Sequence, residues 1–195
     1  MKTDVILVNG SEESVEAALK LADKTAAFKE LSTKNALHLR LLTEEMMSMV
    51  RSIAGDMEGE FWIEDENGVY RLTLKVDSRL SEAKREKLLS ASTSGKNEAT
   101  RGIMGKIRSF FEPEDEYPAF FIMSLADGGG AAYDDMSWSL ELYREQVLQS
   151  VEENREGAKE AWDELEKSVV SHVADDVKVS IHGRDIEMVI YKKMA

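Results

Sequence analysis

The stretch Glu60–Val76, EFWIEDENGVYRLTLKV, decides the fold class of this chain. The segments on both sides of Asn67-Gly68, a dipeptide typical of a two-residue hairpin turn, are predicted to be strands. In the second half, every second residue is apolar and lies on one face of the strand: Tyr70, Leu72, Leu74 and Val76. We therefore predict an antiparallel hairpin with one buried face.

Two further strand regions lie at the ends of the chain. Lys2–Val8 contains a short apolar strand that ends at Asn9-Gly10. Near the other end, apolar residues alternate on both sides of a turn at Gly183-Arg184: Val177, Val179 and Ile181 before it, and Ile186, Met188 and Ile190 after it. This alternation predicts a C-terminal hairpin.

The intervening residues have helical periodicity. Ser11 is a candidate cap for a first helix, and Ser32-Thr33 begins a second, which Gly55 ends. One helical pattern runs from Ser137 to about Val173, and Gly157 is the point at which it kinks or splits. Hairpins and blocks of helices together predict the α+β class, with an antiparallel or mixed sheet and helices packed on one face.

The composition limits the possible functions. The chain has 195 residues, no cysteine and a formal net charge of −13, so it excludes thiol chemistry and is repelled by nucleic acid and anionic membranes. We expect a single domain, 1–195. No apolar run reaches the ~18 residues that span a bilayer, and Met1-Lys2-Thr3-Asp4 lacks the layout of a signal peptide. We therefore expect a cytoplasmic protein that binds neither nucleic acid nor membrane.

The motifs of several enzyme classes are missing from the sequence. His38, His172 and His182 are far apart and outside any metal-ligand spacing, which predicts structural or surface roles and no metal site. There is no G-x-S-x-G elbow and no G-x-G-x-x-G after a strand, and Gly95-Lys96 lacks the flanking residues of a Walker A loop. These absences argue against hydrolytic triads, zinc enzymes and Rossmann dehydrogenases.

Residues 84–108 form a basic segment in an acidic protein. Seven bases and two acids give this segment a net charge of +5, and it also contains Gly102 and Gly105 at a predicted helix start. Glycines, free backbone N–H groups and bases together favour an anion site, most plausibly for phosphates. The alternative is a solvated loop whose bases balance acidic neighbours.

Glu45 is the second candidate functional residue. It precedes Met49 by one turn of the second predicted helix, at the border of an apolar face that includes Met46. A carboxylate at such a border can be a general base with a raised pKa. The alternative is a solvated glutamate beside a core helix whose methionines fill the interior.

The element order and these two candidates resemble the histidine-kinase-like ATPase (GHKL) fold, in particular its small anti-sigma-factor-kinase branch. The resemblance covers residues 1–111 as an ATPase-like core, with 112–175 as an insertion and 176–195 as a hairpin that completes the sheet. It implies a catalytic glutamate at Glu45 and an adenine-reading aspartate at Asp77. The implied lid and phosphate-side positions are Ser94, Gly95, Lys96, Arg101, Gly102 and Gly105.

Two positions depart from the family pattern. Met49 occupies the place of the asparagine that holds Mg²⁺, and a thioether is a poor ligand for that ion. Ser78-Arg79-Leu80 lacks the glycines that let the backbone approach a nucleotide. These departures argue against Mg²⁺ binding and against an active kinase or ATPase.

Two functions remain open. The resemblance implies a divergent regulatory protein that binds ATP or ADP. The alternative is a non-catalytic interaction module that kept the fold and lost the ligand. Its predicted helix, 137–173, would then offer Trp138, Tyr143 and Trp162 to a protein partner or to a second copy of the chain. The alternative is that this helix packs against the sheet of its own chain.

Overall fold

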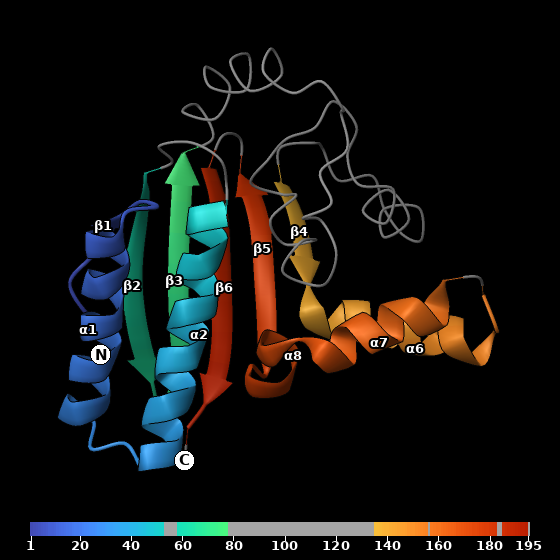
Figure 1. The fold of residues 1–195 in the computed structure, drawn as a ribbon, viewed down its shortest axis with the longest axis horizontal. Coiled ribbons are helices and arrows are strands. Elements are labelled where there is room, and N and C mark those ends of the chain that lie inside the picture. Colours follow the sequence, from blue (N-terminus) through green and yellow to red (C-terminus); the bar gives the residue numbers. More distant parts are fainter. Residues whose placement is uncertain (53–57, 78–134, 156, 183–184, 195) are drawn as a thin grey trace.

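A six-stranded antiparallel sheet forms the centre of the protein (Figure 1). The structure is a computed structural model that describes residues 1–52, 58–77, 135–155, 157–182 and 185–194. The strand order is β1-β2-β3-β6-β5-β4, and every neighbouring pair is antiparallel. The strands are β1 (Ile6–Val8), β2 (Gly59–Glu66), β3 (Val69–Asp77), β4 (Asp135–Ser139), β5 (Asp176–His182) and β6 (Asp185–Lys193). The predicted α+β class is confirmed.

The predicted hairpin at Glu60–Val76 is confirmed as β2 and β3. Asn67 and Gly68 have φ values of 53° and 82°, as a tight turn of the I′ type requires. The alternating apolar residues of β3 are all buried on the same face: Tyr70, Leu72, Leu74 and Val76. The alternation therefore fixes which face of the sheet is covered.

The C-terminal hairpin is inserted into the middle of the sheet. β6 pairs with β3 over nine residues, from Val69↔Lys193 to Asp77↔Asp185. β5 then pairs with β6, and β4 adds the outer edge. The sheet thus joins segments of the chain that are more than a hundred residues apart.

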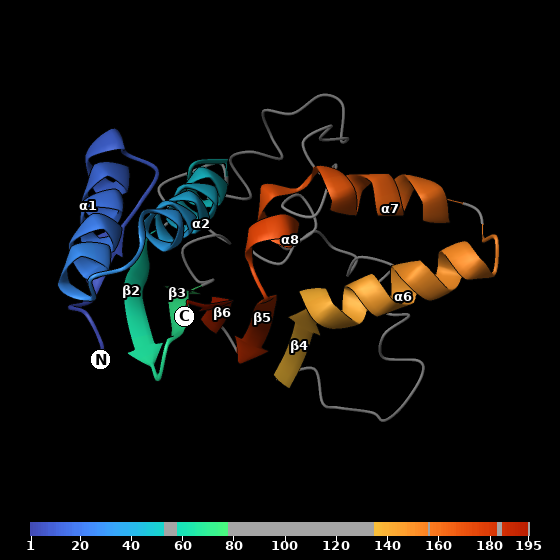
Figure 2. The same ribbon diagram turned by 90° about the horizontal axis from the view of Figure 1, so that it is seen from below.

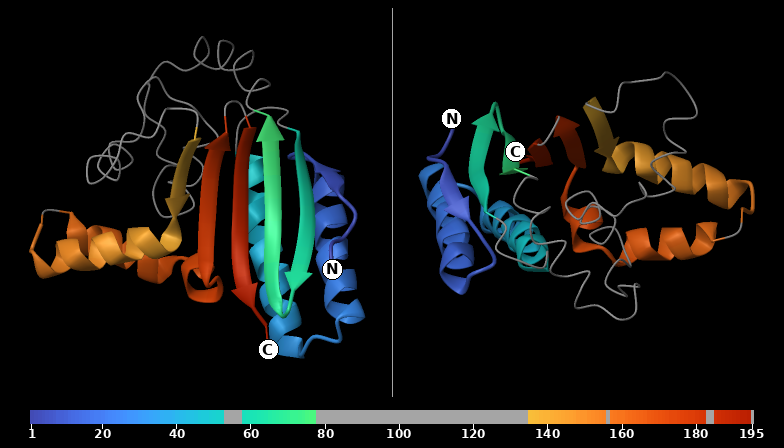
Figure 3. Two further views of the ribbon diagram at one scale, coloured as in Figure 1. Left: turned by 180° about the vertical axis from the view of Figure 1, so that it is seen from behind. Right: turned by 90° about the horizontal axis from the view of Figure 1, so that it is seen from above.

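Helices cover one face of this sheet. α1 (Glu12–Phe28), α2 (Thr33–Ser52) and the short α8 (Val169–Val173) lie on the same side (Figure 2). Seen from behind, no helix of the described residues covers the opposite face (Figure 3). Ser11 caps α1 as predicted, because its Oγ accepts a hydrogen bond from the Ser14 amide at 3.2 Å. The expected packing of helices on one face is confirmed.

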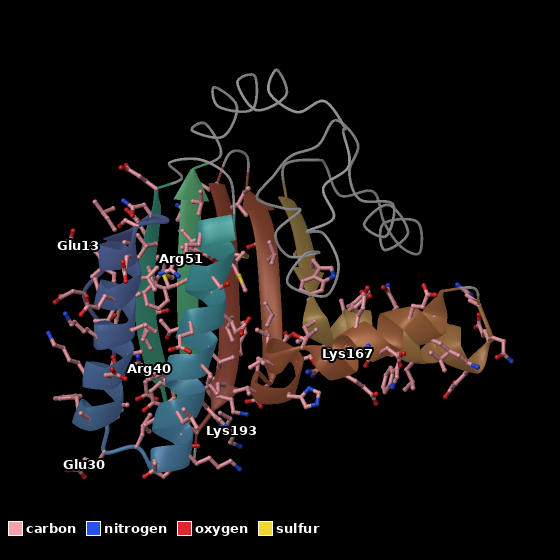
Figure 4. The ribbon with its side chains drawn as sticks, in the orientation of Figure 1. Glu13, Glu30, Arg40, Arg51, Lys167 and Lys193 are labelled. Atoms are coloured by element: carbon pink, nitrogen blue, oxygen red, sulfur yellow. The ribbon has the colours of Figure 1, made fainter. Side chains whose placement is uncertain are left out.

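The core lies between this helical layer and the sheet. Its fully buried members include aromatic, aliphatic and methionine side chains from both layers: Tyr70, Phe61, Leu39, Leu42, Met46, Met47, Ile63, Leu72 and Leu74. Arg40 joins α2 to α1, because its Nη1 lies 2.6 Å from Asp23 Oδ2, and it is seen between the two helices in Figure 4.

The predicted helical pattern over Ser137–Val173 is confirmed for most of its length but is wrong at its start. Ser137 belongs to β4, which is followed by α6 (Leu140–Glu152), α7 (Ala158–Lys167) and α8. Gly157 has a left-handed φ of 76° and splits the pattern, which is one of the two outcomes expected of this glycine. Pairing with β5 holds β4 extended, and it places Trp138 opposite Val179 on the buried side. Strand pairing here overrides helical periodicity.

We predict that Gly68→Ala lowers the free energy of unfolding by about 1–2 kcal/mol, the usual cost of a left-handed backbone with a β-carbon. The added Cβ would also lie 3.2 Å from the carbonyl oxygen of Met194. Gly10→Ala is the matched control, because its Cβ makes an ordinary 3.7 Å contact with Arg51. Urea unfolding of both variants checks this prediction, and equal stabilities would contradict it.

Candidate functional site

Glu45 lies on α2, about two turns before the end of the helix. Its side chain is half-buried, and burial together with the nearby charge of Glu44 raises the pKa of its carboxyl above the ordinary value. Among the described residues, none donates a hydrogen bond or forms an ion pair to this carboxylate. Within the described part of the chain the charge of Glu45 is uncompensated, and carboxylates with a perturbed pKa are common at functional sites.

Arg40, a base of the same helix, pairs with other carboxylates. Arg40 contacts Asp23 on α1 and also lies 3.4 Å, through its Nε, from Glu44 Oε1. Glu44 itself is exposed. The two adjacent glutamates thus differ. Glu44 is exposed and has Arg40 as a cationic partner, whereas Glu45 is half-buried and has no cationic partner among the described residues.

The methionines beside Glu45 belong to the core. Met46 and Met47 are fully buried, and Met49 is 3% exposed. Their predicted role as interior filling is confirmed. Met49, at the position where the resemblance would place an Mg²⁺ ligand, is thus a buried thioether that does not suit this ion.

Asp77 is the last residue of β3 and pairs in register with Asp185 of β6. α2 and β3 run in the same direction and finish at the same end of the sheet (Figure 1). The fold therefore brings the carboxyl-terminal half of α2 and the end of β3 to one region of the protein. These two segments carry Glu45 and Asp77.

The other predicted site residues lie outside the described residues. They are Ser94, Gly95, Lys96, Arg101, Gly102 and Gly105. The same holds for Ser78-Arg79-Leu80 and for most of the predicted insertion 112–175. Their assignment to a lid and a phosphate site stays a prediction.

The structure also contains a cleft that the sequence analysis missed. It has a volume of about 620 Å³ and lies where α6, α7 and α8 meet. Apolar and charged side chains line it: Arg144, Glu145, Leu148, Trp162, Leu165, Glu166, Ser171, His172, Ala174 and Asp175. A continuous helix from 137 to 173 could not form this cleft, because its walls come from separate helices. Gly157 indicated in the sequence that the pattern could split, but no residue pattern indicated that the resulting helices would enclose a cleft.

Two of the aromatic residues expected on a partner surface are instead internal. Trp138 and Tyr143 are each 6% exposed, and their ring centroids lie 6.0 Å apart. They pack in the core because β4 turns directly into α6 at the capping residue Ser139. Trp162 is the remaining member of the expected set, and it lines the cleft.

Metal sites, membrane-spanning helices and known relatives give no further indication of the function. The described residues contain no group of three or more acidic or histidine side chains placed to hold a metal ion. None of the helices in this part of the chain is long and apolar enough to span a bilayer. A scan against models of known protein families gives no match to the chain, and a search of curated proteins gives none either.

We predict that Glu45→Gln raises the free energy of unfolding at pH 7 by roughly 0.5–1 kcal/mol, a range limited by solvent screening of a half-buried charge. Because the folded-state pKa of Glu45 is raised, its contribution is most favourable below the unfolded-state pKa and is lost as the pH rises through the folded-state value. Glutamine carries no charge at any pH, so the variant does not lose this stability between pH 4 and pH 7.

The control for this variant is Glu44→Gln, which changes the same charge at an exposed position. We expect the control to alter stability at pH 7 by less than about 0.5 kcal/mol. Chemical unfolding at pH 4 and pH 7 measures both variants. A destabilised Glu45→Gln protein at pH 7 would show that the carboxylate is compensated after all.

Proposed function

We propose that this chain is a divergent protein of the histidine-kinase-like ATPase (GHKL) fold, related to the anti-sigma-factor-kinase branch, and that it binds an adenine nucleotide in a regulatory role. The observation that carries the proposal is the uncompensated, half-buried carboxylate of Glu45 on the helix that ends beside the end of β3. Retaining such a charge costs stability, which favours a role in ligand chemistry over a role in folding.

In this proposal, one set of residues binds the adenine of the nucleotide and another binds its phosphates. Asp77 accepts a hydrogen bond from the amino group of the adenine. Lys96 and Arg101 meet the phosphates, and Gly102 and Gly105 let a helix start approach them. Ser94 and Gly95 belong to the loop that covers the ligand. The +5 charge of residues 84–108 supports the phosphate end of this arrangement.

The phosphoryl chemistry of the proposed site is limited. Met49 is buried and its thioether suits neither the charge nor the geometry of Mg²⁺, so no step is assigned to that ion. Any remaining hydrolysis would use Glu45 as the base, because its raised pKa makes it a better proton acceptor than an ordinary glutamate. The proposed role is therefore nucleotide sensing, with catalysis secondary.

A non-catalytic interaction module is the second candidate. The helical pair α6 and α7 favours it, because this pair projects from the β4 edge of the sheet (Figures 1 and 2). Both candidates share one fold and differ in whether the end of the sheet near Asp77 binds a nucleotide.

We predict that Asp77→Asn weakens ATP or ADP binding tenfold or more, because a hydrogen bond to a charged group contributes about 1.5–3 kcal/mol. Asp185→Asn is the matched control. Asp185 pairs with Asp77 in register, so this substitution removes the same charge at the same end of the sheet. Its carboxylate is engaged by Lys75 at 2.8 Å. Equal affinities of the wild type and Asp77→Asn, or equal losses in both variants, would contradict the assignment of Asp77.

A further inference from the structure

The cleft between α6, α7 and α8 contains three carboxylates, and of these only Asp175 has a cationic partner among the described residues. Arg144 donates through Nη2 to the carbonyl oxygen of Ser171. Burial alone would raise the pKa of Asp175, but hydrogen bonds from Lys192 and the Lys193 backbone, together with the charge of Arg144, hold it below the ordinary value. Asp175 is therefore compensated mainly by Lys192, whose Nζ lies 2.9 Å from its Oδ1. Arg144 is held by the Ser171 carbonyl and contributes least to the lowered pKa of Asp175.

Glu145 and Glu166 provide the uncompensated negative charge. They stand on α6 and α7, both are exposed, and among the described residues neither forms an ion pair with a base. The segment 140–173 contains nine acidic and four basic residues, so the surrounding helices add to the same negative field. A cationic group is the guest that this field favours.

The apolar part of the cleft suits a planar cation. Trp162 is half-buried, and its Nε1 donates to Glu166 Oε1 at 3.0 Å, which fixes the indole beside a carboxylate. Leu148, which is 47% exposed, and the buried Leu165 continue this surface. A guanidinium group stacks flat on an aromatic face and pairs with carboxylates in a planar fork geometry, whereas an ammonium group can lie over the ring but has neither the plane nor the fork.

We propose that this cleft is a docking site for an arginine-containing segment of a partner protein, in which an arginine side chain lies against Trp162 and its charge meets Glu145 and Glu166. The volume of about 620 Å³ is larger than one side chain and lies within the range of ligand pockets, so residues flanking the arginine also fit. The α6–α7 pair projects from the sheet, so a partner can reach the cleft without approaching the end of the sheet near Asp77 (Figure 1). The inference is independent of the nucleotide proposal.

Fluorescence anisotropy with the full chain tests this site. The probe is a fluorescein-labelled nonapeptide of alternating arginine and leucine, and the comparison peptide carries glutamate in place of arginine. We expect saturable binding of the arginine peptide and no binding of the glutamate peptide. Binding of the glutamate peptide with equal or higher affinity would overturn the proposal in favour of an anion site at Arg144.

Variants separate the cleft from the general negative charge of the protein. The double variant Glu145→Gln, Glu166→Gln should weaken binding of the arginine peptide about tenfold, and Trp162→Phe should weaken it about threefold. The matched control Glu160→Gln, Asp163→Asn removes two exposed charges of α7 outside the cleft lining and should change the affinity less than twofold. Equal losses in the two double variants would overturn the proposal.

The ATP affinity of the same variants keeps the two proposals apart, because the cleft changes should leave it unaltered. Circular dichroism confirms that each variant is folded. Absence of any binding of the arginine peptide to the folded wild type at millimolar concentration would overturn the docking site, whatever the outcome with ATP.

Discussion

The pairing of β3 with β6 is the constraint on which the rest of the structure depends. It joins residues 69–77 to residues 185–193 over nine positions and turns two local hairpins into one continuous sheet. A lone two-stranded hairpin is marginal in water, and the core face exists because both hairpins contribute to it. Leu72 and Ile190, which are partners in this ladder, are both fully buried. The same ladder fixes the position of Asp77, because it is the last paired residue of β3.

The carboxylates of Asp65 and Glu45 are both withdrawn from solvent, but their surroundings differ. Asp65, at the end of β2, is 8% exposed; the side-chain hydrogen bond from Lys29 lowers its pKa most, and the Gly68 amide adds to this effect. That carboxylate secures the hairpin turn to the end of α1. Glu45 has no comparable partner among the described residues, and burial raises its pKa. A charge kept at a cost to stability, on the helix that ends beside β3, is the physical basis of the proposed site.

Local sequence signals were sufficient to predict the features that depend only on residues close together in the chain. The Asn67-Gly68 turn, the Ser11 cap and the alternation in β3 each depend on neighbouring residues, and all three are confirmed. The order of the strands was not predictable, because no local pattern states that β6 lies between β3 and β5. β4 was missed for the same reason: five residues before a helix acquire strand geometry by pairing with β5.

The candidate sites show the same division. Glu45 could be selected from its place at the border of an apolar helix face, but the absence of a compensating partner is a property of the packed structure. The cleft near Trp162 could not be predicted, because it forms where Gly157 reverses the chain and brings α7 alongside α6. His172 was expected to have a structural or surface role. His172 is exposed and lines that cleft. Its Nδ1 lies 3.1 Å from the Ser168 carbonyl oxygen.

Calorimetric titration of ATP and ADP into the full chain, with and without Mg²⁺, is the most direct test of the account. Micromolar affinity that is independent of Mg²⁺ is the predicted result, because the buried thioether of Met49 occupies the position expected to hold the ion. Affinity that requires Mg²⁺ would contradict the assigned role of Met49. The absence of binding at millimolar nucleotide would contradict the nucleotide proposal itself and leave the interaction module as the function of this fold.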